Sequence, residues 1–181
     1  MICNLCPRHC GAERTETVGT GYCRMGSAPV LARAALHHWE EPPISGARGS
    51  GTVFFSGCSL GCVFCQNEKI SHRDFGRSVT LDRLREICQA LIDQGAHNLN
   101  FVNPTHYAHT LAALLEDWRP TIPVVFNTGG YDRTETLRGL EGKIDIYLPD
   151  LKYLDSAAAR RYSGAPDYPE IARAAIREMV R

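Results

Sequence analysis

Three cysteines, Cys58, Cys62 and Cys65, form the tightest group of reactive side chains in the sequence, in the segment GCSLGCVFCQN. Cysteine thiolates ligate iron–sulfur clusters and zinc, and each iron corner of a cubane cluster needs a ligand. Three thiolates from one short loop would leave one iron open to a small molecule. The alternative is a structural zinc loop with a distant fourth ligand. The aromatic Phe64 and the strand–helix series around the loop favour the cluster.

A second group of cysteines lies near the amino terminus and has the spacing C-x2-C-x3-C-x12-C: Cys3, Cys6, Cys10 and Cys23. Four thiolates can enclose one ion or one cluster completely, which suits a structural or an electron-relay site. Zinc and a second [4Fe-4S] cluster remain equal alternatives. Disulfides rank third, because thiols in the cytoplasm are kept reduced. Cys88 stands alone on the apolar face of an expected helix, and we predict a buried structural thiol there.

Composition narrows the function class. The chain has 181 residues and a formal net charge of zero, with 20 basic and 20 acidic residues. This length suits one principal domain, and the lack of a Lys/Arg-rich stripe argues against nucleic acid as a partner. The apolar runs are short and interrupted, and the opening residues lack the order of a secretory signal. We therefore expect a cytoplasmic protein with no membrane partner.

Strand and helix patterns alternate after the amino-terminal region. Hydrophobic periodicity predicts strands over residues 52–56, 98–102, 124–127 and 144–148, and helices over 81–92, 106–118, 133–140, 156–162 and 170–181. Residues 30–39 fit either a strand or a short helix. Repeated strand–helix units imply an α/β fold with a parallel sheet, either open or part of a barrel. The three-cysteine loop would then lie at a strand's carboxyl end, where such folds place their chemistry.

Two regions differ in character along the chain. Residues 1–26 are rich in Cys, Gly and Arg without a periodic apolar pattern, so we predict a small metal-binding module, followed by the main domain over 27–181. Four strand–helix units do not close a barrel, and the final segment EIARAAIREMVR contains no Gly or Pro. We therefore expect the main domain to be incomplete at its carboxyl end.

The segment GCSLGCVFCQN resembles the C-x3-C-x-aromatic-C signature of the radical S-adenosylmethionine (SAM) superfamily. The strings CNLCPRHCG, LHHWEEPPISG, NPTHY, NTGGY and DIYLPDLKY are similar to uncharacterised activating-enzyme-like proteins of the pyruvate formate-lyase activating enzyme branch. This resemblance implies a partial (β/α) barrel of the radical SAM type, of which this chain shows about four units out of six.

The resemblance also implies a reaction. A reduced [4Fe-4S] cluster passes one electron to SAM, giving methionine and a 5′-deoxyadenosyl radical that abstracts hydrogen from a substrate. The implied partners of this oxidoreductase are a one-electron donor such as flavodoxin or ferredoxin and a glycyl-radical enzyme as protein substrate. The rival hypothesis is a non-catalytic iron–sulfur or zinc protein, either an electron carrier or an interaction module. An open iron corner disfavours an electron carrier, because carriers give every iron a protein ligand.

The first cofactor-binding residues implied by the resemblance follow the cysteine loop and the second parallel strand. Phe64 would lie against the adenine, although simple core packing is the alternative, and Asn67 would contact polar groups nearby. Most superfamily members carry Gly-Gly-Glu at the end of the second strand, where this chain has FVNPTH. Asn103 and Thr105 are the candidates there, and they can form hydrogen bonds but supply no carboxylate.

The remaining candidates follow the third and fourth parallel strands. Asn127 and Thr128 occupy the first two positions of the Asp-Thr-Asn-Gly stretch of activating enzymes, with the charge of the Asp removed. Asp150 and Lys152 match the Asp-x-Lys pattern of activating enzymes and are the expected catalytic residues. Side chains that are two residues apart in an extended chain point to the same side, so both Asp150 and Lys152 could reach the cofactor's charged end. A surface ion pair is the alternative.

Overall fold

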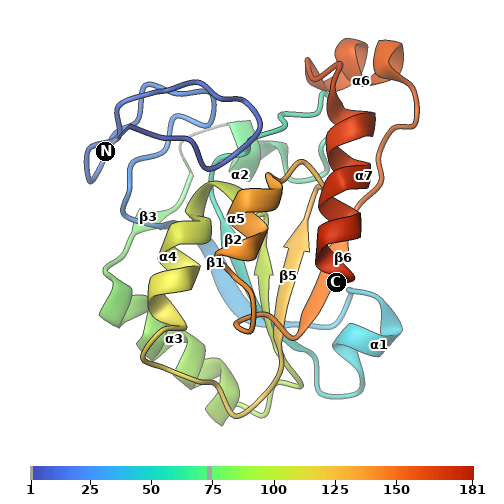
Figure 1. Cartoon of the computed structure of the whole chain (residues 1–181). Coiled ribbons are helices and arrows are strands. Elements are labelled where there is room, and N and C mark those ends of the chain that lie inside the picture. Colours follow the sequence, from blue (N-terminus) through green and yellow to red (C-terminus); the bar gives the residue numbers. More distant parts are fainter. Residues whose placement is uncertain (1, 73–74) are drawn as a thin grey trace.

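The computed structural model of the chain describes residues 2–72 and 75–181, and its centre is a six-stranded sheet in the order β3-β1-β2-β4-β5-β6 (Figure 1). The strands are β1 Val30–His37, β2 Ser50–Phe55, β3 Arg77–Ser78, β4 Leu99–Val102, β5 Val124–Thr128 and β6 Ile146–Pro149. Strands β2, β4, β5 and β6 run parallel, whereas β1 is antiparallel to both β2 and β3. The predicted α/β fold with a mainly parallel sheet is confirmed.

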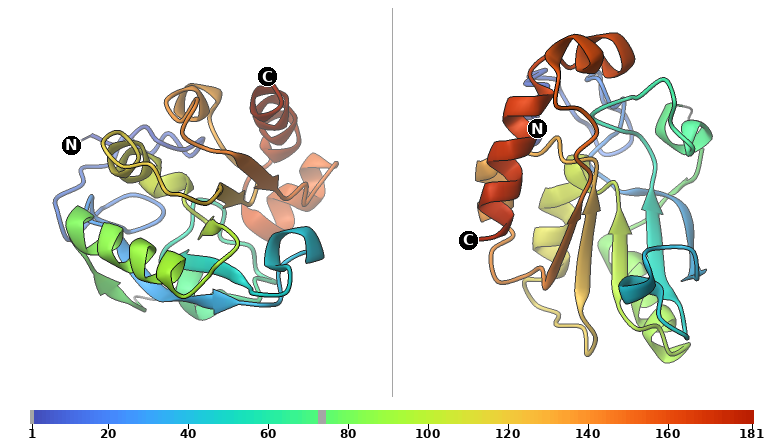
Figure 2. Two further views of the ribbon diagram at one scale, coloured as in Figure 1. Left: turned by 90° about the horizontal axis from the view of Figure 1, so that it is seen from below. Right: turned by 90° about the vertical axis from the view of Figure 1, so that its right-hand side faces the viewer.

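Seven helices lie before, between and after the parallel strands in the described ranges. They are α1 Pro42–Ser45, α2 Glu68–His72, α3 Leu81–Asp93, α4 Ala108–Leu114, α5 Thr134–Arg138, α6 Ser156–Ser163 and α7 Tyr168–Met179, with a 3-10 turn, η1, at Thr105–Tyr107. Helices α3, α4, α5 and α7 pack on one face of the sheet (Figure 2). None of the helices in the described ranges has the length and apolar character needed to span a bilayer.

Two local predictions need correction or completion. Residues 30–37 form a strand, because antiparallel pairing with β2 satisfies their backbone groups. The helix predicted over 106–118 is shorter, since it starts as the 3-10 turn after Pro104 and its α-helical part ends at Leu114. The short elements β3, α1 and α2 carried no periodic signal that could predict them.

Alternation along the strands divides the sheet into two chemically different faces. Val53, Phe55, Leu99, Phe101 and Phe126 are at most 1% exposed and pack against the helices. Successive side chains of a strand point to opposite faces, so their neighbours project away from the helices. We call this second side the inner face. Its members are Thr52, Phe54, Asn100, Val102, Val125 and Asn127. Cys88 of α3 is fully buried in the helix-facing core, as its spacing predicted.

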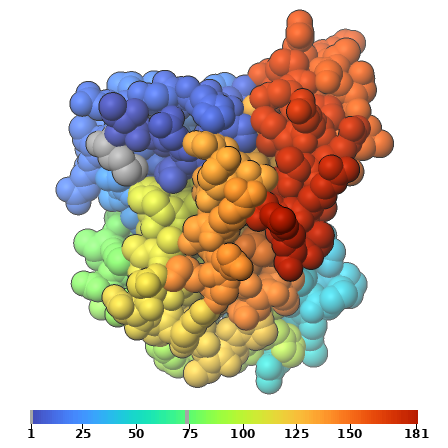
Figure 3. Space-filling view, viewed as in Figure 1, coloured from blue at the N-terminus to red at the C-terminus, as the bar shows by residue number. Residues whose placement is uncertain are grey.

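The amino-terminal segment is fastened to the rest of the molecule by Arg8. Its guanidinium donates hydrogen bonds to the carbonyl oxygens of Ser59 and Leu60 in the cysteine loop, at 2.7 and 2.9 Å. It also donates to the carbonyls of Ser163 and Gly164 at the end of α6, at 2.8 and 2.6 Å. The first residues and the carboxy-terminal helices accordingly lie side by side (Figure 3). A single cation thus joins three segments that are distant in sequence.

Candidate functional site

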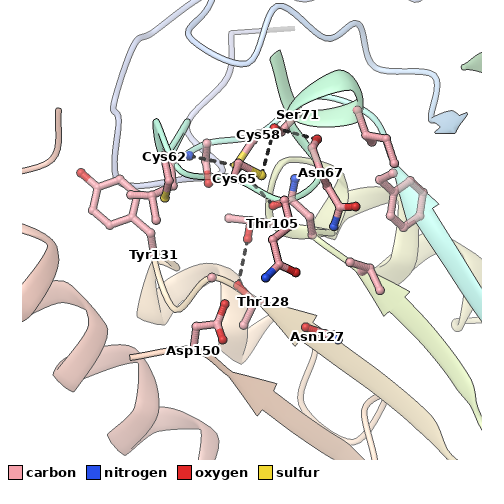
Figure 4. Close-up of a pocket in the computed structure, with 18 of the residues that line it drawn as sticks. Cys58, Cys62, Cys65, Asn67, Ser71, Thr105, Asn127, Thr128, Tyr131 and Asp150 are labelled. Atoms are coloured by element: carbon pink, nitrogen blue, oxygen red, sulfur yellow. Dashed lines mark hydrogen bonds between the residues drawn. The ribbon is translucent and has the colours of Figure 1, made fainter. Parts of the chain in front are cut away.

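A cavity of about 390 Å³ lies at the carboxyl ends of the parallel strands. The cysteine loop forms one wall, and the segments that follow β4, β5 and β6 form the others (Figure 4). Every residue that the sequence assigned to the cluster or to the cofactor lines this one cavity: Cys58, Cys62, Cys65, Phe64, Asn67, Asn103, Thr105, Asn127, Thr128, Asp150 and Lys152. The four strand ends therefore bring together residues spread over 95 positions of sequence, from Cys58 to Lys152.

Each of the three loop sulfurs accepts a hydrogen bond. The Leu60 N–H donates to Cys58 Sγ at 3.3 Å, the Ser163 hydroxyl to Cys62 Sγ at 3.0 Å, and the Ser71 hydroxyl to Cys65 Sγ at 3.3 Å. Donors aimed at sulfur stabilise a metal-bound thiolate and tune the cluster potential. Burial raises the pKa of the Cys58 thiol, partly offset by backbone N–H groups. A cationic metal partner would counter that burial cost, so the donor set fits an iron–sulfur cluster.

Within the described ranges, no three His, Cys, Asp or Glu side chains converge closely enough to hold one metal ion. This holds for the loop and for the amino-terminal cysteines. A single ion requires its ligands to meet at one point, whereas the irons of a cubane occupy separate corners.

The four amino-terminal cysteines nevertheless share one neighbourhood. Burial, together with the nearby thiols of Cys23, Cys3 and Cys10, raises the pKa of the Cys6 thiol to about 12, and the backbone N–H of Arg8 opposes this shift. Cys3 and Cys6 are buried, while Cys10 is exposed. The buried Arg14 guanidinium donates to Cys3 Sγ at 3.7 Å. The segment therefore gathers the four thiols that the spacing grouped.

The main functional candidate that sequence reasoning missed is Asp132. Its carboxylate is 2% exposed and accepts hydrogen bonds from the hydroxyls of Thr105, at 2.7 Å, and Thr128, at 2.6 Å. Thr105 follows β4 and Thr128 ends β5, so Asp132 joins two strand ends. Both threonines line the cavity (Figure 4), whereas Asp132 is not one of its lining residues. The only available signal was an acidic residue shortly after the NTGG segment.

This arrangement fixes the direction of both hydroxyl groups. A hydroxyl has one proton, and the carboxylate takes the protons of Thr105 and Thr128. Both oxygens can therefore act only as acceptors towards the cavity. The NPTH and NTGG segments lack the carboxylates expected at these strand ends. Instead, the buried carboxylate of Asp132 orients two hydroxyl groups, those of Thr105 and Thr128, as acceptors.

Glycine and asparagine supply the backbone shapes that these strand ends require. Gly130 has a φ of +76°, and a side chain there would collide with the carbonyl oxygen of Asp150. Asn103 also lies in the left-handed region, at a φ of +56°, which asparagine tolerates better than most residues. Its side-chain amide donates to the Gly57 carbonyl at 2.6 Å, while Cys58 Sγ lies 3.7 Å from Asn103 Oδ1. Asn103 thus braces the cysteine loop against the end of β4.

The remaining candidates stand at the cavity mouth. Phe64 is 55% exposed and contacts the rings of Tyr153 and Tyr162 edge-on, so it does not belong to the hydrophobic core. Lys152 forms an ion pair with Asp150, whose side chain is 58% exposed. A pair this exposed adds little to stability. The Tyr168 hydroxyl accepts the Lys152 N–H at 2.9 Å and lies 2.8 Å from the Gly129 carbonyl, which fixes the backbone beneath the pair.

Comparison with known proteins identifies the relatives of this chain. Residues 52–180 match the family model of the Radical SAM superfamily. The chain is also similar to an uncharacterized protein of Methanocaldococcus jannaschii, with 30% identity over 178 residues that cover 93% of this chain and 51% of the relative. The chain thus spans about half the length of that relative. The matched region includes the three cysteines of the loop, the strands β4, β5 and β6, and all of β2 except its first two residues.

The buried Asp132 gives a testable dependence of stability on pH. Burial raises its pKa, and the two threonine hydroxyls only partly oppose the shift. The folded protein therefore holds this proton more tightly than the unfolded chain, and stability falls as pH rises from about 4, where an unfolded aspartate titrates. Asp132→Asn removes this loss. The free energy of unfolding of the variant minus that of wild type should therefore increase as the pH rises from acid to neutral.

Urea unfolding of both proteins at several pH values measures this difference. The exposed Asp117→Asn variant controls for the loss of one carboxylate from the chain. A relative stability of Asp132→Asn that decreases as pH rises would contradict the assignment.

Proposed function

The chain belongs to the radical SAM superfamily, and from this premise we propose that it is an oxidoreductase that cleaves SAM reductively to start radical chemistry on a substrate. The observation that carries the proposal is the single cavity shared by the three cysteines and by polar residues from the other strand ends. A volume of about 390 Å³ falls within the range of small-molecule and cofactor sites.

Cys58, Cys62 and Cys65 would hold a [4Fe-4S] cluster through three of its irons. When bound, the cluster supplies the electron that splits SAM into methionine and a 5′-deoxyadenosyl radical. The protein contributes position and polarity. The donors from Leu60 and Ser71 stabilise the sulfurs, and Asn103 holds the loop against β4.

The acceptors at the ends of β4 and β5 suit the amino group of SAM. Thr105 and Thr128 present hydroxyl oxygens that cannot donate in that direction, since Asp132 takes their protons. A protonated amine offers only donors, so acceptor-only hydroxyls complement it. Asp132 acts as a positioning residue in this proposal. Its charge lies behind the two threonine hydroxyls and also favours a cation in the cavity.

Residues at the cavity mouth suit the other parts of the cofactor. Phe64 presents an exposed ring that can stack on the adenine, with Asn67 beside it in the cavity wall. The Lys152 ammonium can meet the cofactor's carboxylate, and Asp150 orients that ammonium through their ion pair. Asn127 supplies a neutral amide where activating enzymes have a carboxylate.

The amino-terminal cysteines form a second metal site in this proposal, with zinc and a second [4Fe-4S] cluster as the two alternatives. Support comes from the common neighbourhood of the four thiols and from Arg8, which connects their segment to the cysteine loop. The division into a module over 1–26 and a core over 27–181 belongs to the same proposal. The Arg8 contacts are consistent with either a structural role or an electron relay for the second site.

The activating-enzyme branch suggests a glycyl-radical enzyme as substrate and a flavodoxin or ferredoxin as electron donor. These partners rest on the similar strings in the sequence. The rival function is a non-catalytic iron–sulfur or zinc protein. It does not explain why polar side chains from the ends of β4 and β5, held in fixed orientations, line the same cavity as the three cysteines.

Anaerobic reconstitution tests the enzyme proposal directly. With reductant and SAM, the wild-type protein should produce 5′-deoxyadenosine, measured by chromatography and mass spectrometry. Cys58→Ala should lose iron and reduce product formation by at least a hundredfold, because one cluster ligand is gone. Cys88→Ala, which removes a buried thiol outside the cavity, is the matched control and should retain activity. A wild-type protein that neither binds SAM nor forms product contradicts the proposal.

The role of Asp132 is tested by the affinity for SAM. In Asp132→Asn the new amide donates to one threonine, whose hydroxyl proton is then released to turn towards the cavity or towards the other threonine, 3.3 Å away. The dissociation constant of SAM, measured calorimetrically, should rise about tenfold, equivalent to about 1.4 kcal/mol for one misdirected hydrogen bond. Iron content should stay unchanged. Equal affinities for the variant and wild type would exclude the positioning role.

Metal analysis tests the second site. The double variant Cys6→Ala/Cys23→Ala should contain less metal than wild type, either about one zinc or about four irons per chain. The iron held by the cysteine loop should remain in this variant, as shown by its SAM-dependent product. Equal total metal in the two proteins would rule out the amino-terminal site.

A further inference from the structure

Two buried hydroxyl groups, those of Ser163 and Tyr153, lie in series behind the sulfur of Cys62. The Ser163 hydroxyl donates to Cys62 Sγ at 3.0 Å, and the Tyr153 hydroxyl lies 2.6 Å from Ser163 Oγ. Ser163 is 3% exposed and Tyr153 is 8% exposed. Cys62 lines the cofactor cavity, whereas the two hydroxyl-bearing residues do not. The pair therefore approaches the cysteine from within the protein, and Ser163 follows it by 101 positions in the sequence.

The direction of these hydrogen bonds is fixed once Cys62 is a metal-bound thiolate. Such a sulfur has no proton and can only accept. The single hydroxyl proton of Ser163 then goes to the sulfur, so the Tyr153 hydroxyl must donate to Ser163 Oγ. Hydrogen bonds in series polarise and strengthen one another. Tyr153 therefore acts on Cys62 through Ser163.

The surroundings of the pair are apolar. Cys62 and Tyr153 belong to one buried hydrophobic cluster, which also contains Leu60, Ala159 and Tyr168. A hydrogen bond to a charged acceptor is stronger in such low-dielectric surroundings than in water. A neutral thiol is only a weak acceptor. Two buried hydroxyls that end on sulfur accordingly suit a metal-bound thiolate better than a free cysteine.

Both hydroxyl-bearing residues are held in place by further contacts. Ser163 is the last residue of α6, and its carbonyl oxygen accepts from the Arg8 guanidinium at 2.8 Å. The Tyr153 ring packs edge-on against the rings of Phe64 and Tyr168, with centroid distances of 6.1 and 5.3 Å. The orientation of the pair thus does not depend on its own hydrogen bond alone.

The other two cysteines of the loop have donors of a different kind. Cys58 Sγ accepts from a backbone N–H at 3.3 Å. The Ser71 hydroxyl, which lies 3.3 Å from Cys65 Sγ, also lies 3.0 Å from the Asn67 carbonyl oxygen, so its proton has two acceptors to choose between. Of the three sulfurs, that of Cys62 has the side-chain donor whose direction is most fully determined.

We propose that Tyr153 and Ser163 are positioning residues that set the reduction potential of the loop cluster through Cys62. This inference rests on the proposed function for the cluster itself. Reduction adds one negative charge to a cluster, so hydrogen-bond donors on its ligands stabilise the reduced form more than the oxidised form. The pair therefore raises the reduction potential and makes the cluster easier for a one-electron donor to reduce.

A redox titration of the reconstituted full chain, followed by electron paramagnetic resonance without SAM, tests this role. In Ser163→Ala the ratio of reduced to oxidised loop cluster at a fixed ambient potential should fall about tenfold, equivalent to a shift of about 59 mV to lower potential. Tyr153→Phe keeps the ring and the Ser163 donor, so its shift should have the same direction and be smaller. The spectrum of Cys58→Ala is subtracted throughout to remove any signal from the amino-terminal cysteines.

Tyr131→Phe is the matched control. It removes a phenol oxygen from the same hydrophobic cluster, but this hydroxyl donates to the Asp167 carboxylate at 2.8 Å instead of to the chain that ends on sulfur. Its reduction potential should equal that of wild type. A shift in Tyr131→Phe as large as that in Tyr153→Phe overturns the inference, because loss of any phenol oxygen from the cluster would then explain both.

The remaining outcomes separate this inference from the proposed function. An unchanged or higher potential in Tyr153→Phe, or in a Ser163→Ala protein that retains the cluster, overturns the inference even if wild type forms 5′-deoxyadenosine. Lower potentials in both variants of a protein that forms no 5′-deoxyadenosine contradict the SAM-cleaving function and leave the role of the pair standing. A wild-type chain whose loop takes up no iron contradicts both.

Discussion

The alternation of side chains along the parallel strands is the constraint on which the rest of the structure depends. Val53, Phe101 and Phe126 must lie against the helices to form the core, so the residues between them are forced onto the inner face. This explains how Asn100, which is fully buried and polar, can stand in the middle of a hydrophobic strand. A shift of one residue in register would exchange the two faces, so that the core residues and the polar residues of the inner face would both be misplaced.

The same sheet concentrates chemistry at its carboxyl edge. Parallel strands end at one edge, so short loops that are distant in sequence meet there. The cysteine loop contributes sulfur, while the segments after β4 and β5 contribute neutral oxygen acceptors whose direction is set by Asp132. A carboxylate placed one layer behind the cavity can orient its neighbours and supply long-range charge without direct contact with a ligand. Arg8 completes the edge by joining the amino-terminal segment to the cysteine loop.

Local patterns in the sequence predicted most of the fold and identified most of the residues that line the candidate site. Strands β2, β4, β5 and β6 were predictable because each combines an apolar run with a turn signal, and the cysteine spacing alone predicted a metal loop. The strand at residues 30–37 was ambiguous, since its identity depends on pairing with β2. Asp132 could not be identified from the sequence, because its importance comes from two hydroxyls at positions 105 and 128 that only the folded chain brings to it.

The central claim is that the cysteine loop holds a cluster with one iron open to SAM. Electron paramagnetic resonance of the reduced, reconstituted protein with and without SAM tests it most directly, with Cys62→Ala as the reference that isolates the signal of this loop. The account predicts that SAM changes the spectrum of the wild-type protein and leaves that of the variant unchanged. A loop cluster whose spectrum is the same with and without SAM would contradict the account.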